Sequence, residues 1–481
     1  LFIFNFSTQT LIIMNKTNTQ NDTTFSGTYY CSGRNAQSTE DGSMNNPFKT
    51  LEKAIRTIPG GSTLLLERGY EYPFFSEIAF RVISLGAYGE GAKPVVSRFI
   101  KIKNVNKNLF TRDDPKFHIW TLNFDRLVEL SGHSADDLKN IGFIYNPQTD
   151  EIVFGEKVAF KNAVDMYVAF NYTAPSQSQL HAFTCLNKDG SFFQSSDGRT
   201  IKMVYNHDPN DLTDLWFATD GQFLNSPHDC TIQDIKITGY AANAIFMNQD
   251  NVTVKNVEFD LIGGRAFDMA KVETTSFRRD GNGIELWKTS KNTTPLSNIE
   301  ILNCSFNRIF SGAIALGGSV YRNLGIPGAD NILIHDCNID HCRYAITTAM
   351  AYIEDNGSQT GGARVNVRFY NNASRNAGDN QFGSPFFSDA HLYSGLPGFV
   401  IANNDFYNGN FQYRYTYDFG YEMQQGNVCH IAPGQNLITI RTYKTSEVMY
   451  PYDPTEESVA EAVAEYRELA DDKYTVFECI D

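Results

Sequence analysis

Apolar and polar positions repeat at a fixed spacing through the middle of the chain. Five segments each carry an Asn or Asp at one register: Asp234, Asn256, Asn303, Asp336 and Asn403. The first two are 22 residues apart, and the 33 residues between Asn303 and Asp336 become 22 once the 11-residue loop 319–329 is removed. Self-similarity at one period, built from short strands, predicts a solenoid. A strand–turn–strand unit of this length favours a parallel β-helix.

Stacked coils explain both the apolar positions and the polar positions of the repeat. One coil cannot bury its own apolar side, whereas stacked coils share a continuous core. The expected inward residues are Ile232, Ile235, Ile237, Val254, Val257, Phe259, Ile301, Cys304, Phe306, Ile334, Cys337 and Ile339. The Asn/Asp column is expected at a tight turn, where a short polar side chain bonds the backbone and tolerates left-handed geometry. A β-sandwich is the alternative, but it gives no reason for the polar column.

The segments around the repeat follow other patterns. Towards the N-terminus we expect a strand at 28–31, an amphipathic helix at 48–58 with Pro47 in its first turn, and a strand at 63–66. The segment 101–220 interrupts the repeat and is predicted to be a β-rich insert, with strands within 117–124, 141–145, 151–160 and 164–172. A helix at 456–471 is predicted to cap the last coil, whose apolar edge would otherwise be exposed.

These elements define the predicted architecture. It is an all-β, right-handed parallel β-helix solenoid with an inserted β subdomain and helical end caps. The predicted segments are 1–25 as a disordered leader, 26–100 as the N-terminal cap and first coils, 101–220 as the insert, 221–445 as the β-helix and 446–481 as the C-terminal cap.

Composition narrows the class of partner. A formal net charge of −15 argues against nucleic acid, which calls for a basic face. No apolar run approaches the roughly 18 residues of a membrane span. The eight cysteines lack metal-ligand spacing, and Cys304 and Cys337 share an inward column, so we expect buried thiols there. No metal or cofactor is predicted. A secreted or periplasmic location is expected, although residues 1–14 lack a clear signal peptide.

A candidate groove follows the longest insertion, 265–281, because long loops on a solenoid mark its functional face. Aligning the next strand with its neighbours places Ile284 in an inward column with Ile245, Ile314 and Ile346. Strand alternation then turns Glu285 and Trp287 outward. Their expected neighbours are Phe246, Ala315 and Thr347 beside Glu285, and Asn248, Gly317 and Ala349 beside Trp287. An acid and an indole beside small residues indicate a cavity of sugar size. The alternatives are an exposed surface acid and a packing tryptophan.

Two stretches resemble known proteins. Residues 46–55 and 59–70 resemble the opening segment of bacterial right-handed parallel β-helix proteins of the pectate-lyase-like superfamily. The run RDGNGIELW at 279–287 is similar to an R-x-GNGIE-x-W strand of β-helix proteins regarded as glycoside hydrolases or their relatives. Their next coil ends in Y-D-x-G-I-T-x-Q-G, and its Asp falls on Ser311 here. The resemblance implies a glycan substrate, with Asn282 and Ser311 in the site. The departure at Ser311 removes one expected carboxyl.

Glycoside hydrolysis ordinarily uses two carboxyls, one of which is kept protonated. Glu285 is the predicted acid/base. Its partner must come from a bordering loop or a neighbouring coil, and Asp280 and Asp379 are the candidates. The predicted substrate-binding residues are Trp287, Arg279, Asn282, Ser311, Arg343 and His391, the last placed in the loop 386–395. An equally supported interpretation of Arg279 and Arg343 is that they are plain surface charges.

Three functions stay open at this point. A hydrolase acting on a neutral or mildly acidic glycan is the reading that the sequence favours. A polysaccharide lyase would need clustered oxygen ligands for a cation, and the sequence shows no convincing Asp/Glu cluster on adjacent coils. A non-catalytic glycan-binding solenoid is the third reading, and the serine at position 311 favours it. Fold alone decides between none of them.

Overall fold

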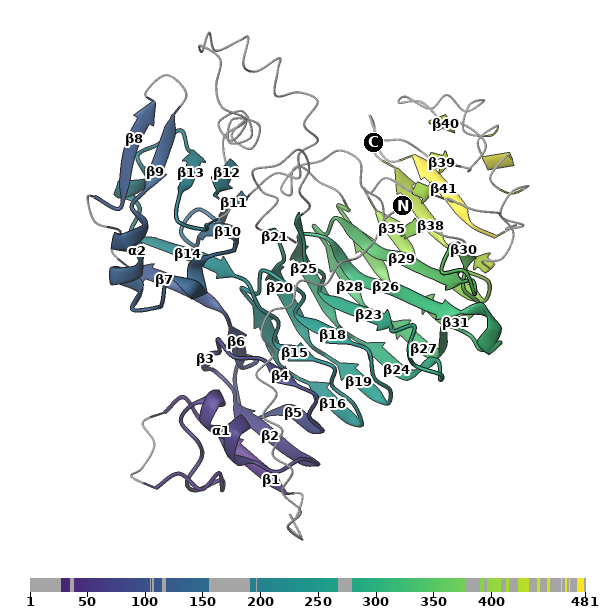
Figure 1. Cartoon of the computed structure of the whole chain (residues 1–481), viewed down its shortest axis with the longest axis horizontal. Helices are drawn as coiled ribbons and strands as arrows, with labels where there is room; N and C mark the ends of the chain where they lie inside the picture. Colours follow the sequence, from purple (N-terminus) through teal and green to yellow (C-terminus); the bar gives the residue numbers. More distant parts are fainter. Residues whose placement is uncertain are drawn as a thin grey trace.

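The chain folds as an all-β solenoid whose coils contribute strands to three parallel sheets (Figure 1). This computed structural model describes residues 27–34, 39–103, 105, 108–114, 118–154, 191–195, 197–266, 279–377, 390–392, 396–407, 412–414, 423–431, 439–441, 448–449, 460, 463–464, 467 and 474–479. Each strand pairs with its counterpart in the next coil, so the sheets run along the axis of the solenoid.

The first two sheets each contain ten described strands. In order along the first they are β1 (Thr28–Cys31), β2 (Ser62–Glu67), β5 (Ile83–Tyr88), β16 (Cys230–Gln233), β19 (Val252–Lys255), β24 (Leu296–Leu302), β27 (Ala329–His335), β31 (Val365–Tyr370), β34 (Phe399–Ala402) and β37 (Met423–Gln425). Along the second they are β3 (Glu71–Pro73), β6 (Val95–Ser97), β17 (Lys236–Thr238), β20 (Glu258–Ile262), β25 (Ser305–Ile309), β28 (Asn338–Asp340), β32 (Ala373–Arg375), β35 (Asp405–Tyr407), β38 (Val428–Ile431) and β41 (Val476–Cys479).

The third sheet carries the candidate groove. Its strands are β4 (Ile78–Ala79), β15 (Leu224–Asn225), β18 (Ile245–Met247), β23 (Ile284–Lys288), β26 (Gly312–Tyr321), β29 (Tyr344–Ile353) and β30 (Gln359–Gly362), with β33 (Ala390–Leu392) also paired to β29. All pairs in this sheet are parallel except β29 with β30. Short strands outside the three sheets are β21 (Arg265–Ala266), β22 (Arg279–Asp280), β36 (Gln412–Arg414), β39 (Thr439–Arg441) and β40 (Val448–Met449).

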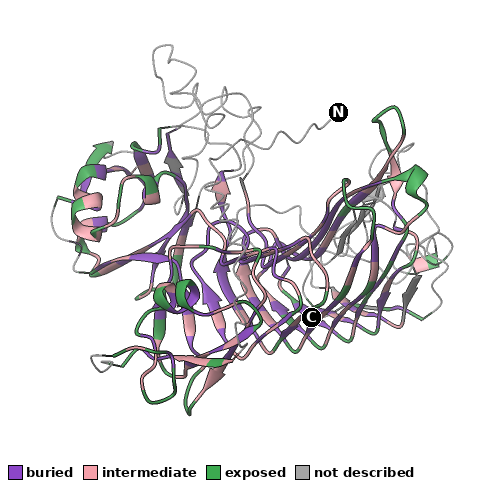
Figure 2. Cartoon of the chain, turned by 60° about the horizontal axis from the view of Figure 1, so that its bottom comes forward, coloured by how far each residue is buried: buried purple, intermediate pink, exposed green. Residues whose placement is uncertain are grey.

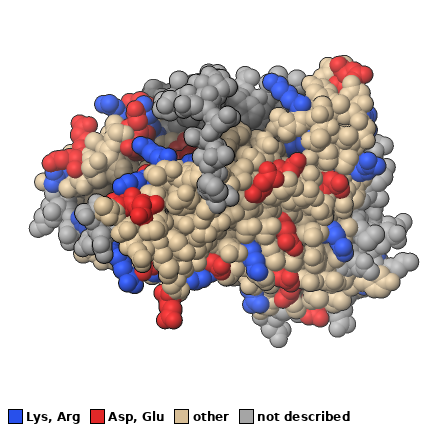
Figure 3. Space-filling view, turned by 90° about the horizontal axis from the view of Figure 1, so that it is seen from below, with Lys and Arg blue, Asp and Glu red and all other residues tan. Residues whose placement is uncertain are grey.

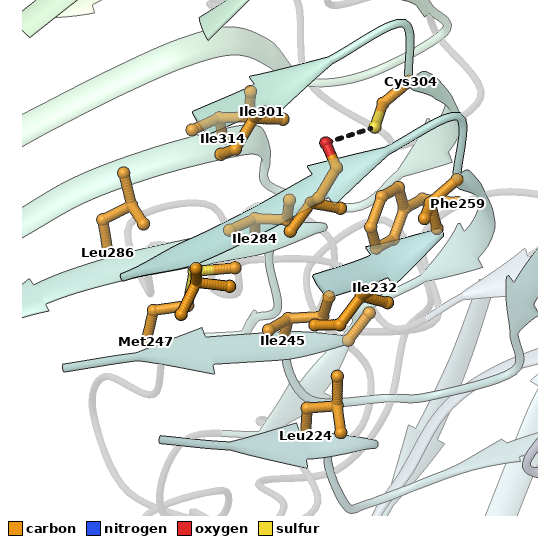
Figure 4. Close-up of a cluster of buried hydrophobic side chains, with 14 of the residues drawn as sticks. Leu224, Ile232, Ile245, Met247, Phe259, Ile284, Leu286, Ile301, Cys304 and Ile314 are labelled. Atoms are coloured by element: carbon orange, nitrogen blue, oxygen red, sulfur yellow. Dashed lines mark hydrogen bonds between the residues drawn. The ribbon is translucent and has the colours of Figure 1, made fainter. Parts of the chain in front are cut away.

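The predicted inward columns are confirmed. Ile232 pairs with Val254, Val254 with Ile301, and Ile301 with Ile334. All twelve predicted inward residues are at most 1% exposed. Figure 4 shows members of these columns, such as Ile245 and Ile284, pointing into the same interior. Figure 2 shows that buried residues follow the strands of the coils. Shared burial of aliphatic side chains is therefore what holds neighbouring coils together.

The predicted turn column is also confirmed. Asp234, Asn256, Asn303, Asp336 and Asn403 all have φ between 52° and 60°, the left-handed region that short polar side chains tolerate. The column is linked from coil to coil, because the Asn256 side-chain amide donates to the Asp234 carboxylate at 2.6 Å. At Asp234 and Asn256 the polar residue therefore both shapes the turn and joins adjacent coils.

A buried asparagine ladder lies one residue beyond the turn column in the later coils. The backbone N–H of Cys337 donates to the side-chain oxygen of Asn372 at 3.0 Å. Asn372 donates in the same way to Asn404 at 2.9 Å, and Asn404 to Asn427 at 3.0 Å. These three asparagines are at most 2% exposed. Earlier coils place Cys304 and Cys337 at this position as buried free thiols, as predicted.

The N-terminal helix is shorter than predicted. Helix α1 spans Leu51–Thr57, whereas the prediction began it at Phe48. Thr50 is the N-cap, and its side chain accepts from the backbone of Lys53 at 3.2 Å. The backbone of Phe48 is instead hydrogen-bonded to Tyr30 and Ser32 across the start of the solenoid. Pairing with β1 therefore excludes Phe48, and Pro47 before it, from the helix.

The insert forms an eight-stranded sheet with its own apolar core. Its strands are, in order, β7 (Phe99–Lys103), β14 (Asp214–Thr219), β10 (Ile141–Asn146), β11 (Glu151–Phe154), β12 (Ser191–Gln194), β13 (Ile201–Val204), β9 (Ile119–Leu122) and β8 (Phe110–Asp114). The predicted strand at 117–124 ends at Leu122, because Asn123 caps helix α2 (Phe124–Ser131). The strand predicted at 164–172 lies outside the described residues. The division into domains stays a prediction.

Contacts fix the insert against the corner between the second and third sheets. Phe99 and Phe143 of the insert pack with Leu261 and Phe310 of the coils. The ion pair between Arg308 and Asp150 crosses the same boundary. Short 3₁₀ turns lie at Asp136–Leu138, Pro209–Asp211 and Arg322–Leu324.

Four residues of the predicted C-terminal helix are described, and all four are helical: Ala460, Val463, Ala464 and Arg467. The capping role of that segment stays a prediction. In the part of the chain that the structure describes, no helix has the length and apolar character needed to cross a membrane. Acidic and basic side chains are interspersed over the face drawn in Figure 3.

Candidate functional site

Glu285 lies in a row of residues on the outer face of the third sheet. Its backbone pairs with Phe246 on one side and Ala315 on the other, and Ala315 pairs with Thr347. This is the predicted register. Thr347 pairs in turn with His391, so His391 belongs to strand β33 and not to the loop in which the prediction placed it.

Alternation along β23 separates core from surface as predicted. Ile284, Leu286 and Lys288 are buried, whereas Glu285 and Trp287 are half-buried. The inward column of Ile245, Ile284, Ile314 and Ile346 is fully buried and anchors the strand. Glu285 and Trp287 consequently point to the same outer face.

Trp287 lies against the next coil. Gly317 pairs with Trp287, and a β-carbon at position 317 would be 2.8 Å from two atoms of the indole ring. The glycine therefore leaves room for the ring to cover the neighbouring strand. Ala349, the partner of Gly317 on the following coil, continues this surface of small residues. An aromatic ring is thus held on the outer face, two residues from a carboxylate.

Asn243 orients Glu285. Its side-chain amide donates a hydrogen bond to the Glu285 carboxylate, and its side-chain oxygen accepts from the backbone of Asn282 at 2.8 Å. Asn282 repeats the arrangement one coil later, because its oxygen accepts from the backbone of Gly312 at 2.9 Å. Asn243 and Asn282 are 5% and 6% exposed. The two amides therefore hold the corner next to Glu285 in one geometry.

Arg265 lies among several carboxylates at the turn of the coil next to Glu285. Strands β21 and β22 pair Arg265 with Asp280, and the guanidinium forms a salt bridge with Asp220 at 3.1 Å. Burial lowers the pKa of Arg265, but the charges of Asp220, Asp280 and Glu285 raise it by more. Asn140 of the insert donates to Asp220 at 3.2 Å and so attaches this corner to the insert.

Ser311 and Arg343 occupy the same corner on the following coils. Both lie one residue before the paired positions Gly312 and Tyr344. The backbone of Ser311 donates to Gly281, next to Asp280, at 3.1 Å. Arg343 is 7% exposed, and its guanidinium lies 5.4 Å from the ring of Tyr344. The structure thus brings Asp280, Ser311 and Arg343 to one edge of the face that carries Glu285.

Three predicted site residues fall outside what the structure describes in full. Asp379 lies outside the described residues, and only the backbones of Arg279 and His391 are described. Their predicted roles stay predictions.

Sequence reasoning missed several residues around this site: Arg98, Asp220, Asn243 and Arg265. One signal was available for Asn243, because Asn-Ala-Ile at 243–245 and Asn-Gly-Ile at 282–284 share a register. Arg98 is 8% exposed, and its guanidinium donates to the carbonyl of Phe75. Within the described residues, no three or more His, Cys, Asp or Glu side chains are arranged to hold a metal ion.

Comparisons with known proteins leave the family open. No family model matches the chain, and no curated protein matches it. The chain is similar to the structure titled "The complex structure of XylC with xylose", with 14% identity, a TM-score of 0.39 and coverage of 86% of this chain and 69% of that one. It is also similar to a GH136 lacto-N-biosidase from Eubacterium ramulus in two crystal structures. Identity is 12%, the TM-scores are 0.36 and 0.34, and coverage is 94% of this chain and 68% of those. These likenesses are too distant to carry an argument.

Proposed function

We propose that this protein is a carbohydrate-active enzyme that hydrolyses glycosidic bonds of a poly- or oligosaccharide in a groove on the third sheet. One observation carries the proposal. Glu285 is held by Asn243 on an outer face that also presents the Trp287 ring against Gly317. Sugar recognition calls for an apolar platform for the ring face and polar groups for its hydroxyls, and this surface offers both.

We further propose that the solenoid is a right-handed parallel β-helix. Its three parallel sheets and regular coils support this assignment. Parallel crossover connections are right-handed in nearly all proteins, which supports the handedness. The resemblance of the segments 46–55 and 59–70 to β-helix proteins points to the same fold.

In this proposal Glu285 is the acid/base residue, and Asp280 and Asp379 are candidates for the second carboxyl. Trp287 stacks against a sugar ring. Arg279, Asn282, Ser311, Arg343 and His391 bind sugar hydroxyls or a sugar carboxylate. Proton transfer by one well-placed carboxyl contributes roughly 10²- to 10⁴-fold to such a reaction.

A non-catalytic glycan-binding role is the second candidate. Ser311 favours it, because the resembling hydrolases have an aspartate at this register. The two roles share the same surface and differ in whether a bond is cleaved.

The test is a screen of purified protein and its Glu285→Gln variant on aryl glycosides and on plant and microbial polysaccharides. New reducing ends and the ultraviolet absorbance of unsaturated uronates are measured together. We expect reducing ends without that absorbance, and their loss in Glu285→Gln. Glu90→Gln, which changes an exposed acid in the loop after β5, is the matched control and should stay active. Unsaturated products would identify a lyase, and glycan binding without cleavage would identify a binding protein.

A further inference from the structure

Glu77 lies on the same face of the third sheet as Glu285, at the end of that face formed by the first coils. It directly precedes β4, whose Ala79 pairs with Asn225. Its carboxylate accepts hydrogen bonds from the side chains of Asn225, at 2.6 Å, and Gln222. Asn225 pairs with Phe246, and Phe246 pairs with Glu285. Asn225, which binds the Glu77 carboxylate, therefore lies two strand spacings from Glu285 on the same outer face.

This spacing suits a pair of catalytic carboxyls. Neighbouring strands are about 4.8 Å apart, so Asn225 and Glu285 lie about 10 Å apart along the sheet. Glu285 leans towards Asn243, which precedes β18, and so towards Glu77. The two carboxyls are thus separated by roughly two strand spacings, about 10 Å. Inverting glycosidases use roughly 6.5–9.5 Å, because a water molecule must fit between the base and the sugar.

Glu77 is within reach of a ligand. Its side chain is open to solvent and lines a hollow of about 680 Å³ next to helix α1. The other residues that line this hollow are Glu52, Ile55, Arg56, Phe74, Ser76 and Arg81. The leaving group of a substrate cleaved between Glu285 and Glu77 has room on this side.

The surroundings of Glu77 favour its protonated form. Although the side chain reaches solvent, partial desolvation by the protein atoms around the hollow raises the pKa of Glu77 above that of an ordinary glutamate. The hydrogen bonds from Asn225 and Gln222 and the charges of Arg98 and Arg265 lower it, but by less. A raised pKa is the direction of shift that a general acid needs.

Asp280 is placed for a different task. It lies at the corner of the coil, paired with Arg265 across strands β21 and β22, and its charge acts on the guanidinium. Arg265 in turn binds Asp220 at 3.1 Å. This arrangement suits a carboxylate that holds an arginine in place, whereas a proton donor must face the scissile bond.

We infer that Glu77 is the general acid that pairs with Glu285, and that the enzyme inverts the configuration of the anomeric carbon. This inference rests on the proposed function. Glu285 takes a proton from a water molecule, and the water oxygen bonds to the anomeric carbon. The bond from that carbon to the leaving oxygen breaks as Glu77 gives its proton to this oxygen. One water is consumed, and both carboxyls return to their starting forms by proton exchange with solvent.

The experiment compares Glu77→Gln, Asp280→Asn and the unaltered enzyme on the best substrate of the screen and on the matching 2,4-dinitrophenyl glycoside. We expect Glu77→Gln to lower kcat on the natural substrate by roughly 10²- to 10⁴-fold. The dinitrophenyl glycoside should be far less affected, because its leaving group needs no proton. The high-pH limb of the kcat/KM profile should disappear. Proton NMR immediately after mixing should show the inverted anomer.

Several results would overturn the inference. A product that retains its configuration would contradict the two-carboxyl geometry. The inference would also be wrong if Asp280→Asn lost activity in the expected pattern while Glu77→Gln kept full activity. In both cases hydrolysis that depends on Glu285 would leave the proposed function standing. Absence of hydrolysis on every substrate would overturn both. Circular dichroism and the thermal midpoint check folding of Glu77→Gln, in which the amide oxygen still accepts from Asn225.

Discussion

The indole of Trp287 and the backbone of Gly317 are in direct contact across adjacent coils. A β-carbon at position 317 would lie 2.8 Å from two ring atoms, closer than such contacts allow. The contact sets one edge of the ring against the next strand, on the face that carries Glu285. Because both residues belong to strands whose inward neighbours are buried, the position of the ring is set by the core beneath it.

Gly317→Ala should therefore move the ring and weaken glycan binding. Aromatic contacts of this kind contribute about 0.5–1.5 kcal/mol, so we expect a loss of about three- to tenfold in affinity. Calorimetry with an oligosaccharide from the screen measures this change. Gly60→Ala is the control, because a β-carbon there meets no atom within 4 Å. Unchanged affinity in Gly317→Ala would show that the ring is not part of the binding surface.

Arg308 joins two coils of the solenoid to each other and to the insert. It pairs with Asp260 at 2.8 Å and with Asp150 of the insert at 2.5 Å. Burial lowers the pKa of Arg308, but the two carboxylates raise it by more. Arg308→Ala leaves the buried Asp260 with Lys236 as its described cation, and should cost about 2–3 kcal/mol.

Asp150→Ala is the matched control for Arg308→Ala. The Asp150 side chain is 68% exposed, so its ion pair is screened by solvent and should contribute less than about 1 kcal/mol. Urea unfolding followed by circular dichroism compares the two variants. Equal losses in both would contradict the larger contribution assigned to the buried Asp260 contact.

The buried asparagine ladder should stabilise the later coils. The Asn404 amide donates to the carbonyl of Phe369 at 3.0 Å, and its oxygen accepts from Asn372 at 2.9 Å. Asn404→Ala leaves buried backbone groups without partners, and should lower the free energy of unfolding by roughly 2–4 kcal/mol. Asn366→Ala, which removes an exposed hydrogen bond to Asp330, should change it by less than about 0.5 kcal/mol. A similar small change for both would show that the ladder is not stabilising.

The described cysteines should be unreactive in the folded protein. Burial is the main cause that raises the pKa of Cys31 and of Cys230 to about 12, and it also raises that of Cys342. All six free cysteines that the structure describes are buried. Brief exposure to iodoacetamide at neutral pH, followed by peptide mass spectrometry, should label none of these six until denaturant is added. Rapid labelling of Cys304 or Cys337 in the native protein would contradict the inward column.

The register of the coils could be predicted from the order of the residues. A repeat of about 22 residues specifies which side chains face inward, because a slip of one residue would expose the entire apolar set. The column of Glu285, Ala315 and Thr347 and the left-handed turns at Asn256 and Asn303 followed from this period alone. The start of α1 could not be predicted in the same way, because Phe48 is bound by β1 and not by its neighbours in sequence.

The tertiary structure alone decided which polar residues meet at the face of the third sheet. More than a hundred residues of insert separate β6 from β15, so no local pattern relates Glu77 to Asn225 or to Glu285. Likewise, Asp220 and Arg265 meet only because the insert packs on the corner of the coils. Local periodicity determines the orientation of each side chain within its coil. Which charged side chains interact depends on how the coils stack, because electrostatic interactions depend on distance in space and not on separation along the chain.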